Sequence, residues 1–206
     1  MRLEEIIFVS PLGLRYLCLP KYISMKFREK ELRGFFVIEP QVFGDSRGYF
    51  MESYKKELFE KYIGVVDFIQ DNESRSSYGV VRGLHFQRGE WSQSKLVRVT
   101  QGRVYDVVVD LRRTSPTFGQ YVGIELSDEN KKQLFVPRGF AHGFAVLSET
   151  AQFCYKVDNV YAPHEEVTLF YNDPHVAVQW PIKAEEMLLS EKDKKGLGFE
   201  EIEVFE

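Results

Sequence analysis

From about Phe35 to Tyr171, apolar and polar residues alternate in short runs that are separated by turn-forming residues. Alternation with a period of two is typical of strands that bury one face. Many short strands at near-regular spacing, with few helices between them, favour an antiparallel sandwich or barrel. The predicted strands occupy residues 35–38, 97–99, 104–110, 122–126, 133–136, 144–147, 151–157 and 167–171.

Two pairs of these strands are separated by segments that have the character of hairpin turns. Gln101-Gly102 joins the second and third predicted strands, and the polar segment from Ser127 to Asn130 joins the fourth and fifth. A short glycine-containing or polar turn between apolar strands is a hairpin signal. We therefore predict that each pair forms a β-hairpin.

Two other segments have helical character. Residues 53–63 are predicted to form a helix, because Ser53 can cap the first turn and four apolar side chains share one face. Those side chains belong to Tyr54, Leu58, Phe59 and Tyr62. Residues 190–193 predict the start of a second helix near the end of the chain.

The first part of the chain follows neither pattern. Residues 6–25 are mostly apolar, but Pro11, Gly13 and Pro20 interrupt them. No small-residue cleavage site follows, so a signal peptide is not expected, and no apolar run reaches the roughly 20 residues of a membrane helix. We interpret residues 1–26 as an N-terminal extension of unknown role and residues 27–206 as a single domain.

Composition and charge narrow the range of functions. The chain of 206 residues carries a formal net charge of −4, which does not favour a nucleic-acid-binding surface. Cys18 and Cys154 are far apart and lack a CxxC pattern, so neither a disulfide framework nor a zinc site is expected. Two reduced thiols are typical of a cytoplasmic protein, and we expect that location.

The strongest chemical signal is the segment Arg82-Gly83-Leu84-His85-Phe86-Gln87, and Lys95 follows ten residues after its histidine. Histidine titrates near neutral pH, and a nearby cation can stabilise the oxyanion that forms when a carbon acid loses its proton. The pair therefore points to an enzyme that moves protons next to a carbonyl group. The alternative for a single histidine is a hydrogen-bonded structural role.

A second histidine, His142, ends the segment Pro137-Arg138-Gly139-Phe140-Ala141-His142. This segment resembles the second motif of the cupins, which are small double-sheet jelly rolls. A metal-dependent cupin also needs an earlier His-x-His pair, whereas His85 is followed by Phe86 and Gln87. A catalytic metal usually takes three protein ligands, so we expect no metal here.

Eight ordered segments extend this resemblance to one cupin-related family. They are residues 38–53, 70–76, 81–87, 94–120, 137–144, 153–163, 172–174 and 189–193. On these segments the chain resembles the dTDP-4-dehydrorhamnose 3,5-epimerases from about Leu32 to Gly196. The resemblance implies a mostly β, cupin-type jelly roll with a few short helices and an isomerase with no metal and no redox cofactor.

The family inverts C3 and C5 of a 4-keto sugar through an enolate, and the resemblance assigns four catalytic residues. His85 matches the base, and Asp193 matches the carboxylate that holds it. Lys95 matches the cation near the developing C4 oxyanion, and Tyr155 matches the acid that protonates the opposite face. From spacing alone, Ser190 and Asp193 also fit a helix capping box, which leaves a structural role open for Asp193.

The resemblance also implies eight substrate-binding residues and a homodimer. Arginines match contacts to the diphosphate, polar side chains match contacts to the nucleotide, and aromatic side chains pack on the base or sugar. In this family the N-terminal arm crosses to the second subunit, so Arg47 is expected to serve the site of the partner. The eight residues are Arg47, Phe50, Glu52, Gln70, Asn72, Arg82, His142 and Tyr161.

Three alternatives remain open. A related enzyme acts on a dTDP-4-keto-6-deoxy sugar but epimerises only C3 or C5, or moves the ketone. A catalytically inactive cupin binds a nucleotide sugar without proton exchange, and a metal-dependent cupin oxygenase requires a transition metal. Two departures from the family pattern, Phe86 and Tyr171, keep an aromatic ring and are expected to have little effect.

Overall fold

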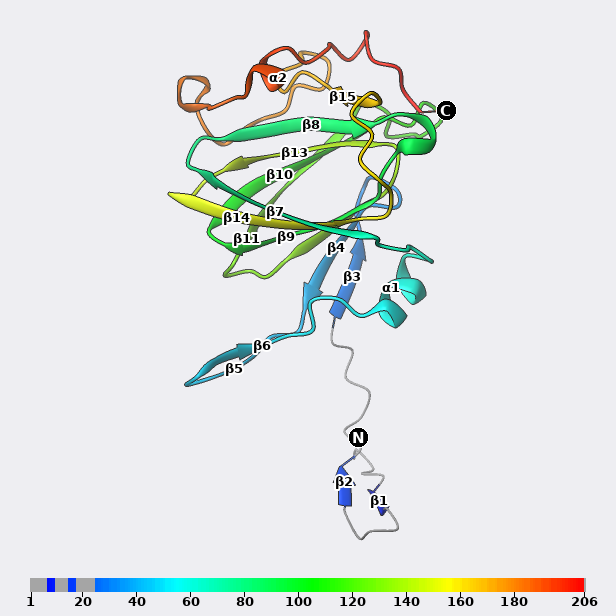
Figure 1. The fold of residues 1–206 in the computed structure, drawn as a ribbon, viewed down its shortest axis with the longest axis vertical. Helices are drawn as coiled ribbons and strands as arrows, with labels where there is room; N and C mark the ends of the chain where they lie inside the picture. Colours follow the sequence, from blue (N-terminus) through cyan, green and yellow to red (C-terminus); the bar gives the residue numbers. More distant parts are fainter. Residues whose placement is uncertain (1–6, 10–14, 18–24, 206) are drawn as a thin grey trace.

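The computed structural model describes residues 7–9, 15–17 and 25–205. Its main body consists of two antiparallel sheets that lie one above the other (Figure 1). The six-stranded sheet has the order β3 (Met25–Glu29), β4 (Phe36–Pro40), β12 (Gln133–Val136), β9 (Lys95–Gln101), β14 (Thr150–Val157) and β7 (Gln70–Ser77). The five-stranded sheet has the order β11 (Tyr121–Ser127), β10 (Arg103–Asp110), β13 (Phe140–Val146), β8 (Val81–Gln87) and β15 (Glu166–Thr168).

Apolar side chains from the two facing sheets form the main core. Val97, Val99 and Phe153 of the six-stranded sheet belong to the same buried cluster as Val108 and Phe144 of the five-stranded sheet. Alternate residues along each strand enter this core, as the period-two pattern predicts. The predicted fold class, a mostly β jelly roll with few helices, is confirmed.

Both predicted hairpins are wrong. β9 lies in the six-stranded sheet and β10 in the five-stranded sheet, so the Gln101-Gly102 turn carries the chain from one sheet to the other. The turn between β11 and β12 makes the same crossing. Turn residues specify a reversal of the chain, but they do not specify whether the next strand pairs with the previous one or packs across the core from it.

The internal helix exists but is shorter than predicted, and its predicted cap is wrong. Helix α1 (Lys56–Tyr62) begins after an extended Lys55, with no side-chain cap. The carbonyl of Ser53 instead accepts a hydrogen bond from the Gln133 side chain, which keeps this part of the chain extended along the sheet. Phe59 is buried as expected and packs in a cluster with Met25.

The start of the chain is described only in part. β1 (Ile7–Val9) and β2 (Arg15–Leu17) form a small antiparallel pair, and β3 starts at Met25, next to the predicted domain boundary. Cys18 and most of the predicted extension lie outside the described residues. Within the described ranges, no helix is long and apolar enough to cross a membrane.

A hairpin extends away from the barrel. β5 (Phe43–Asp45) and β6 (Gly48–Phe50) pair with each other and project from the lower end of the six-stranded sheet (Figure 1). Every residue of the two strands is exposed, including Phe50, whose exposure is 67%. An isolated two-stranded hairpin is marginally stable in water, and the aromatic side chains of this hairpin remain exposed.

Candidate active site

Two histidines lie side by side on the inner face of the five-stranded sheet. His85 of β8 and His142 of β13 are direct partners across the two strands. The register shifts next to this pair, at Gly143, and Gly83 has a φ of +120°. A Cβ atom on Gly83 would lie 2.6 Å from the Cα of Gly143, so the close approach of the strands requires glycine there.

His85 forms a short hydrogen bond with a buried aspartate. Its Nε2 lies 2.7 Å from Oδ1 of Asp193, whose exposure is 3%. The contact requires Nε2 to carry a proton, so the neutral imidazole has its free lone pair on Nδ1. Burial raises the pKa of the Asp193 carboxyl, but hydrogen bonds from His85 and Ser190 outweigh this effect and hold its pKa below the ordinary value.

Asp193 lies in helix α2 (Glu191–Lys194), and Ser190 is the cap of that helix. The Ser190 hydroxyl accepts a hydrogen bond from the backbone N–H of Asp193 at 3.1 Å. The same hydroxyl lies 2.6 Å from Oδ2 of Asp193 and can donate to it. The backbone of Asp193 thus takes part in capping, while its carboxylate is directed to His85. The capping contact with Ser190 and the carboxylate contact with His85 therefore occur together in the structure.

A small cavity of about 70 Å³ opens beside His85, between the two sheets. It brings together three of the four predicted catalytic residues and two of the predicted substrate-binding residues. Asp193 stands behind His85. The cavity is lined by Arg82, His85, Lys95, His142, Gly143, Phe144, Phe153 and Tyr155.

Lys95 enters the cavity from the six-stranded sheet, opposite the histidines. Its ammonium group has no hydrogen bond or ion pair with any of the described residues. Burial lowers its pKa from 10.5 to about 8, although the nearby carboxylates of Glu166 and Asp106 oppose this shift. The side chain is therefore a cation near neutral pH that remains available to a ligand.

Tyr155 lies in the same sheet as Lys95, with its Cα opposite that of Val97. Burial raises the pKa of its phenol, and the charge of Glu166 adds to this effect, while Arg82 opposes it. The hydroxyl therefore keeps its proton at neutral pH. This is the state that a proton donor requires.

A second histidine–aspartate pair lies beneath the cavity. The Nε2 atom of His142 lies 3.0 Å from both carboxylate oxygens of Asp106, which is fully buried. Burial raises the pKa of Asp106, and His142 and Lys95 oppose that shift. Asp106 was not among the predicted residues. Its signal in the sequence was a carboxylate within the otherwise apolar run from Val104 to Val109.

The other predicted substrate-binding residues of the barrel lie at the edge of the six-stranded sheet. Gln70 and Asn72 of β7 are joined by a hydrogen bond of 2.7 Å, and Asn72 is the strand partner of Tyr155. The Nε atom of Arg82 donates to Ser76, also on β7. Of these residues, Arg82 lines the small cavity, whereas Asn72 lines a larger one together with Tyr155.

Tyr161 belongs to a polar network at the rim that sequence analysis did not detect. Its hydroxyl donates to Glu166 at 2.6 Å, and the same carboxylate oxygen lies 2.5 Å from the ammonium group of Lys192. Burial raises the pKa of Glu166, but Lys192 and Tyr161 outweigh that effect and lower it. Nothing in the sequence pattern distinguished Glu166 from its neighbour Glu165.

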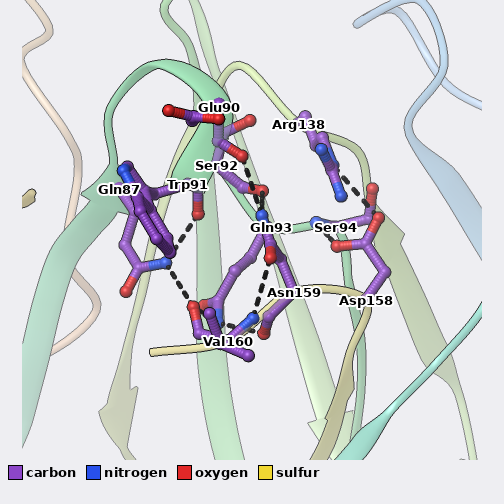
Figure 2. A network of polar contacts seen from close by, with 10 residues as sticks. All are labelled: Gln87, Glu90, Trp91, Ser92, Gln93, Ser94, Arg138, Asp158, Asn159 and Val160. Carbon is purple, nitrogen blue, oxygen red and sulfur yellow. Dashed lines mark hydrogen bonds and ion pairs between the residues drawn. The ribbon is translucent and has the colours of Figure 1, made fainter. Parts of the chain in front are cut away.

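The loop that carries Tyr161 is tied to the chain that follows β8 (Figure 2). The Gln87 amide donates to the carbonyl groups of Trp91 and Val160 and accepts from the backbone of Ala162. Asn159 donates to the carbonyls of Glu90 and Ser92. These side-chain contacts to backbone groups fix both loops at the end of the barrel that carries Tyr161.

Three predicted residues do not reach the cavity of their own chain. Arg47 lies at the tip of the projecting hairpin, with a side-chain exposure of 87%, and pairs with Asp45. Phe50 lies on the same hairpin, and Glu52 pairs with Lys55 at 3.6 Å. Among the described residues, these groups are separate from His85 and its neighbours.

A larger cavity of about 310 Å³ lies on the other face of the six-stranded sheet, where Arg98, Cys154 and Lys156 point. It contains no histidine, and its charged groups are partly paired, as Lys156 is with Asp71. The smaller cavity, by contrast, holds His85 and the ammonium group of Lys95, with which no described residue pairs. In the described part of the chain, no group of three or more His, Cys, Asp or Glu side chains is placed to hold a metal ion.

Known proteins resemble this chain over most of its length. The sequence profile for dTDP-4-dehydrorhamnose 3,5-epimerase matches residues 29–201. A dTDP-4-dehydrorhamnose 3,5-epimerase from Pseudomonas aeruginosa is 51% identical over 182 residues, which cover 88% of this chain and 99% of that protein.

Solved structures give the same result. The crystal structure of the dTDP-4-dehydrorhamnose 3,5-epimerase from Elizabethkingia anophelis NUHP1 has a TM-score of 0.83 and 52% identity, covering 86% of this chain and 97% of the other. The dTDP-6-deoxy-D-glucose-3,5-epimerase from Legionella pneumophila, in complex with dTDP-4-keto-L-rhamnose, has a TM-score of 0.83 and 46% identity, covering 87% and 95%.

Proposed function

Because the chain belongs to the dTDP-4-dehydrorhamnose 3,5-epimerase family, we propose that it converts dTDP-4-dehydro-6-deoxy-D-glucose into dTDP-4-dehydro-L-rhamnose by inverting C3 and C5. The observation that carries this proposal is the short contact between His85 and Asp193 beside an unpaired Lys95. A base, a cation for the enolate oxygen and a neutral phenol face one small cavity. These are the groups that proton exchange next to a ketone requires.

In the proposed reaction His85 is the base. Its Nδ1 removes the proton from the carbon next to the C4 ketone, because Nε2 is already engaged with Asp193. The Asp193 carboxylate stabilises the imidazolium that forms. The Lys95 ammonium stabilises the negative charge that develops on the C4 oxygen.

Tyr155 is the proposed acid on the opposite face of the sugar. His85 belongs to the five-stranded sheet and Tyr155 to the six-stranded sheet, so the two groups approach the cavity from different sides. Delivery of a proton from the side opposite to its removal inverts the carbon centre. His142, held by Asp106, positions the sugar from beside His85.

The nucleotide half of the substrate is proposed to lie toward β7. Arg82 holds the diphosphate, since a planar guanidinium can form two parallel hydrogen bonds to phosphate oxygens. Gln70 and Asn72 supply amide groups to the nucleotide base. Tyr161, at the rim, packs on the base or the sugar.

We propose that the active enzyme is a homodimer in which the hairpin of each chain enters the site of its partner. The exposed Phe50 and the outward-facing Arg47 support this arrangement, because neither reaches the cavity of its own chain. In the dimer, Arg47, Phe50 and Glu52 contact the nucleotide bound by the partner. We also propose that the enzyme acts in the cytoplasm and requires no metal or redox cofactor.

Incubation with the 4-keto substrate in deuterated water tests the function directly. Exchange at both C3 and C5, followed by NMR, is the expected result, together with formation of the L-rhamno product. Deuterium at only one carbon would instead identify a single-site epimerase. Tight binding of the substrate without any exchange would identify a nucleotide-sugar-binding protein.

A further inference from the structure

The end of the ladder between β9 and β14 lies directly beside two groups of the site. Lys95, the first residue of β9, is paired with Val157, the last residue of β14. Tyr155 lies two residues earlier on β14, opposite Val97, so its side chain and that of Lys95 leave the same face of the sheet. Both line the cavity beside His85. The separation of the two groups therefore depends on the backbone at a strand end, where ladders open most readily.

The Lys95 side chain depends on its own backbone for its position. Among the described residues, none forms a hydrogen bond or an ion pair with the ammonium group. A displacement of the first residues of β9 is therefore passed directly to the cation. Any group that fixes the start of this strand also fixes the place of the positive charge in the cavity.

A side-chain carboxylate closes this end of the ladder. The next residue pair beyond Lys95 and Val157 is Ser94 and Asp158, which would exchange two backbone hydrogen bonds in a continued antiparallel ladder. The bond from the Asp158 N–H to the Ser94 carbonyl is long, at 3.4 Å. The Ser94 N–H donates instead to Oδ1 of Asp158, at 2.6 Å (Figure 2). A strong, charge-assisted bond thus takes the place of the second backbone bond where β9 begins.

The same carboxylate also reaches the loop that leads to His142. Its Oδ2 atom accepts a hydrogen bond from Nε of Arg138 at 3.1 Å (Figure 2). Arg138 lies between β12 and β13, and β13 carries His142. Ser94 is buried and the Asp158 side chain is only 11% exposed, so water competes little for the bond between them. One carboxylate therefore joins the ends of β9 and β14 to the loop before β13.

We propose that Asp158 is a positioning residue for the reaction, which fixes the start of β9 against the end of β14 and so sets the separation of Lys95 from Tyr155. This inference rests on the proposed roles of those two residues in proton transfer. The sugar must meet the cation and the acid together, and a misplacement of about 1 Å can cost up to about 100-fold in rate. The bond to Ser94 carries the role, whereas the ion pair with Arg138, whose side chain is 45% exposed, contributes little.

Four variants separate the bond to Ser94 from the charge of the carboxylate. Asp158→Asn keeps an acceptor at the same place but loses the charge, and Asp158→Glu keeps the charge but carries it one methylene further. Asp158→Ala loses both, and Arg138→Met removes only the ion pair. The Asn and Glu variants keep a polar side chain of similar size, so the comparison between them stands even if Asp158→Ala does not fold.

The expected kinetic result is a loss of kcat that follows geometry and not charge. With Asp158→Ala and Asp158→Glu we expect kcat to fall about tenfold, and with Asp158→Asn and Arg138→Met to stay within about twofold of the wild type. KM should stay within about twofold in all four, because the Tyr161 loop keeps its own bonds to Gln87. A wild-type kcat in Asp158→Glu, or a loss in Asp158→Asn as large as in Asp158→Glu, would overturn the proposal.

Hydrogen exchange tests the strand end without an activity assay. Mass spectrometry of the peptide that contains residues 94–96 should show faster amide exchange in Asp158→Glu and wild-type exchange in Asp158→Asn. Ser148→Ala is the matched control, because Ser148 accepts a hydrogen bond from the backbone N–H of Arg103, just beyond the other end of β9. It should leave kcat and the exchange of residues 94–96 unchanged. Unchanged exchange in Asp158→Glu would contradict the proposed role.

The two kinds of measurement separate this proposal from the proposed function. If the wild type fails to exchange protons of the dTDP sugar, the proposed function is wrong, whatever the amide exchange shows. If the wild type is active and all Asp158 variants keep its kcat, only the role of Asp158 is wrong. Thermal unfolding of each variant identifies any loss of fold.

Discussion

The Nε2 atom of His85 and the Oδ1 atom of Asp193 lie 2.7 Å apart, although the two residues are separated by 108 positions in the sequence. The same carboxylate oxygen also lies 3.3 Å from the backbone N–H of Gly83, so Asp193 fixes both the imidazole and the strand that carries it. A change in the Asp193 side chain or a displacement of α2 would therefore alter the position of the His85 imidazole.

Asp193→Asn should lower kcat by about 10²- to 10³-fold while the protein stays folded. Asparagine cannot stabilise the imidazolium, but the effect should be smaller than the ~10⁴ of a serine protease, because the His85 side chain is 26% exposed. Ser190→Ala is the contrasting variant, with an expected loss of about 1 kcal/mol in stability from the missing cap. Steady-state kinetics and thermal unfolding measure both effects. If Asp193→Asn kept its turnover but lost stability, Asp193 would have only a structural role.

His85→Ala should abolish deuterium exchange at both carbons and leave dTDP binding nearly unchanged, because the imidazole faces the sugar. Arg82→Ala should do the reverse and weaken dTDP binding by about 1.5–3 kcal/mol, the value of a lost charge-assisted hydrogen bond. Titration calorimetry with dTDP and NMR exchange separate the two. Exchange at C3 near the wild-type rate in His85→Ala would refute the base assignment.

The pH profile should show an alkaline limb that belongs to Lys95. Its pKa is lowered to about 8 by burial, and the protonated form stabilises the enolate, so kcat/KM is retained below that pH and lost above it. The phenol of Tyr155 has a raised pKa and keeps its proton through this range. Lys95→Met should be nearly inactive at every pH. A wild-type profile that stays flat well above the pKa of Lys95 would contradict this assignment.

Gly83→Ala should destabilise the protein by about 3 kcal/mol or more, because a Cβ atom would collide with the backbone of Gly143. Gly89→Ala is a matched control. Gly89 also has a positive φ, of +54°, but its Cβ position is open, so only about 1 kcal/mol of backbone strain is expected. Chemical denaturation measures the stability of both variants. Equal losses of stability would show that the close approach of β8 and β13 does not add to the effect of alanine at position 83.

Mixed dimers test whether Arg47 and Phe50 serve the partner's site. An Arg47→Ala/Phe50→Ala chain keeps its own His85, and a His85→Ala chain keeps an intact hairpin. Co-expression of the two should restore about a quarter of the wild-type sites, because only half of the dimers are mixed and each has one complete site. If the hairpin served its own chain, mixing would restore no activity.

The sequence indicated which side chains gather at the cavity better than it indicated how the strands are connected. The family resemblance named His85, Lys95, Tyr155 and Asp193, and the structure places the first three around one cavity with Asp193 behind the histidine. The motif around His85 is informative about the site because its glycine is required sterically: Gly83 allows β8 to approach β13 closely. The strand positions were also largely correct, since burial of alternate residues is a local pattern.

The connections between strands were not predictable in the same way. The Gln101-Gly102 turn looks like a hairpin turn, yet it joins strands of different sheets. The choice between pairing and crossing depends on which strands are already neighbours, and no local signal carries that information. The polar contacts of Glu166 were missed for a related reason, because its partners Lys192 and Tyr161 approach it only in the folded chain.

The division of the site between the two sheets has a consequence for how the enzyme loses activity. In the proposed mechanism the base, His85, comes from the five-stranded sheet, and the cation and the acid, Lys95 and Tyr155, come from the six-stranded sheet. A compact intermediate that retains its strands but loses specific side-chain packing keeps most of its far-ultraviolet circular dichroism. In such a state the imidazole and the ammonium group no longer share a fixed separation, so turnover stops while the strands persist. The rate of epimerisation therefore depends directly on tertiary packing. Mild heat or acid should abolish activity before the far-ultraviolet circular dichroism changes.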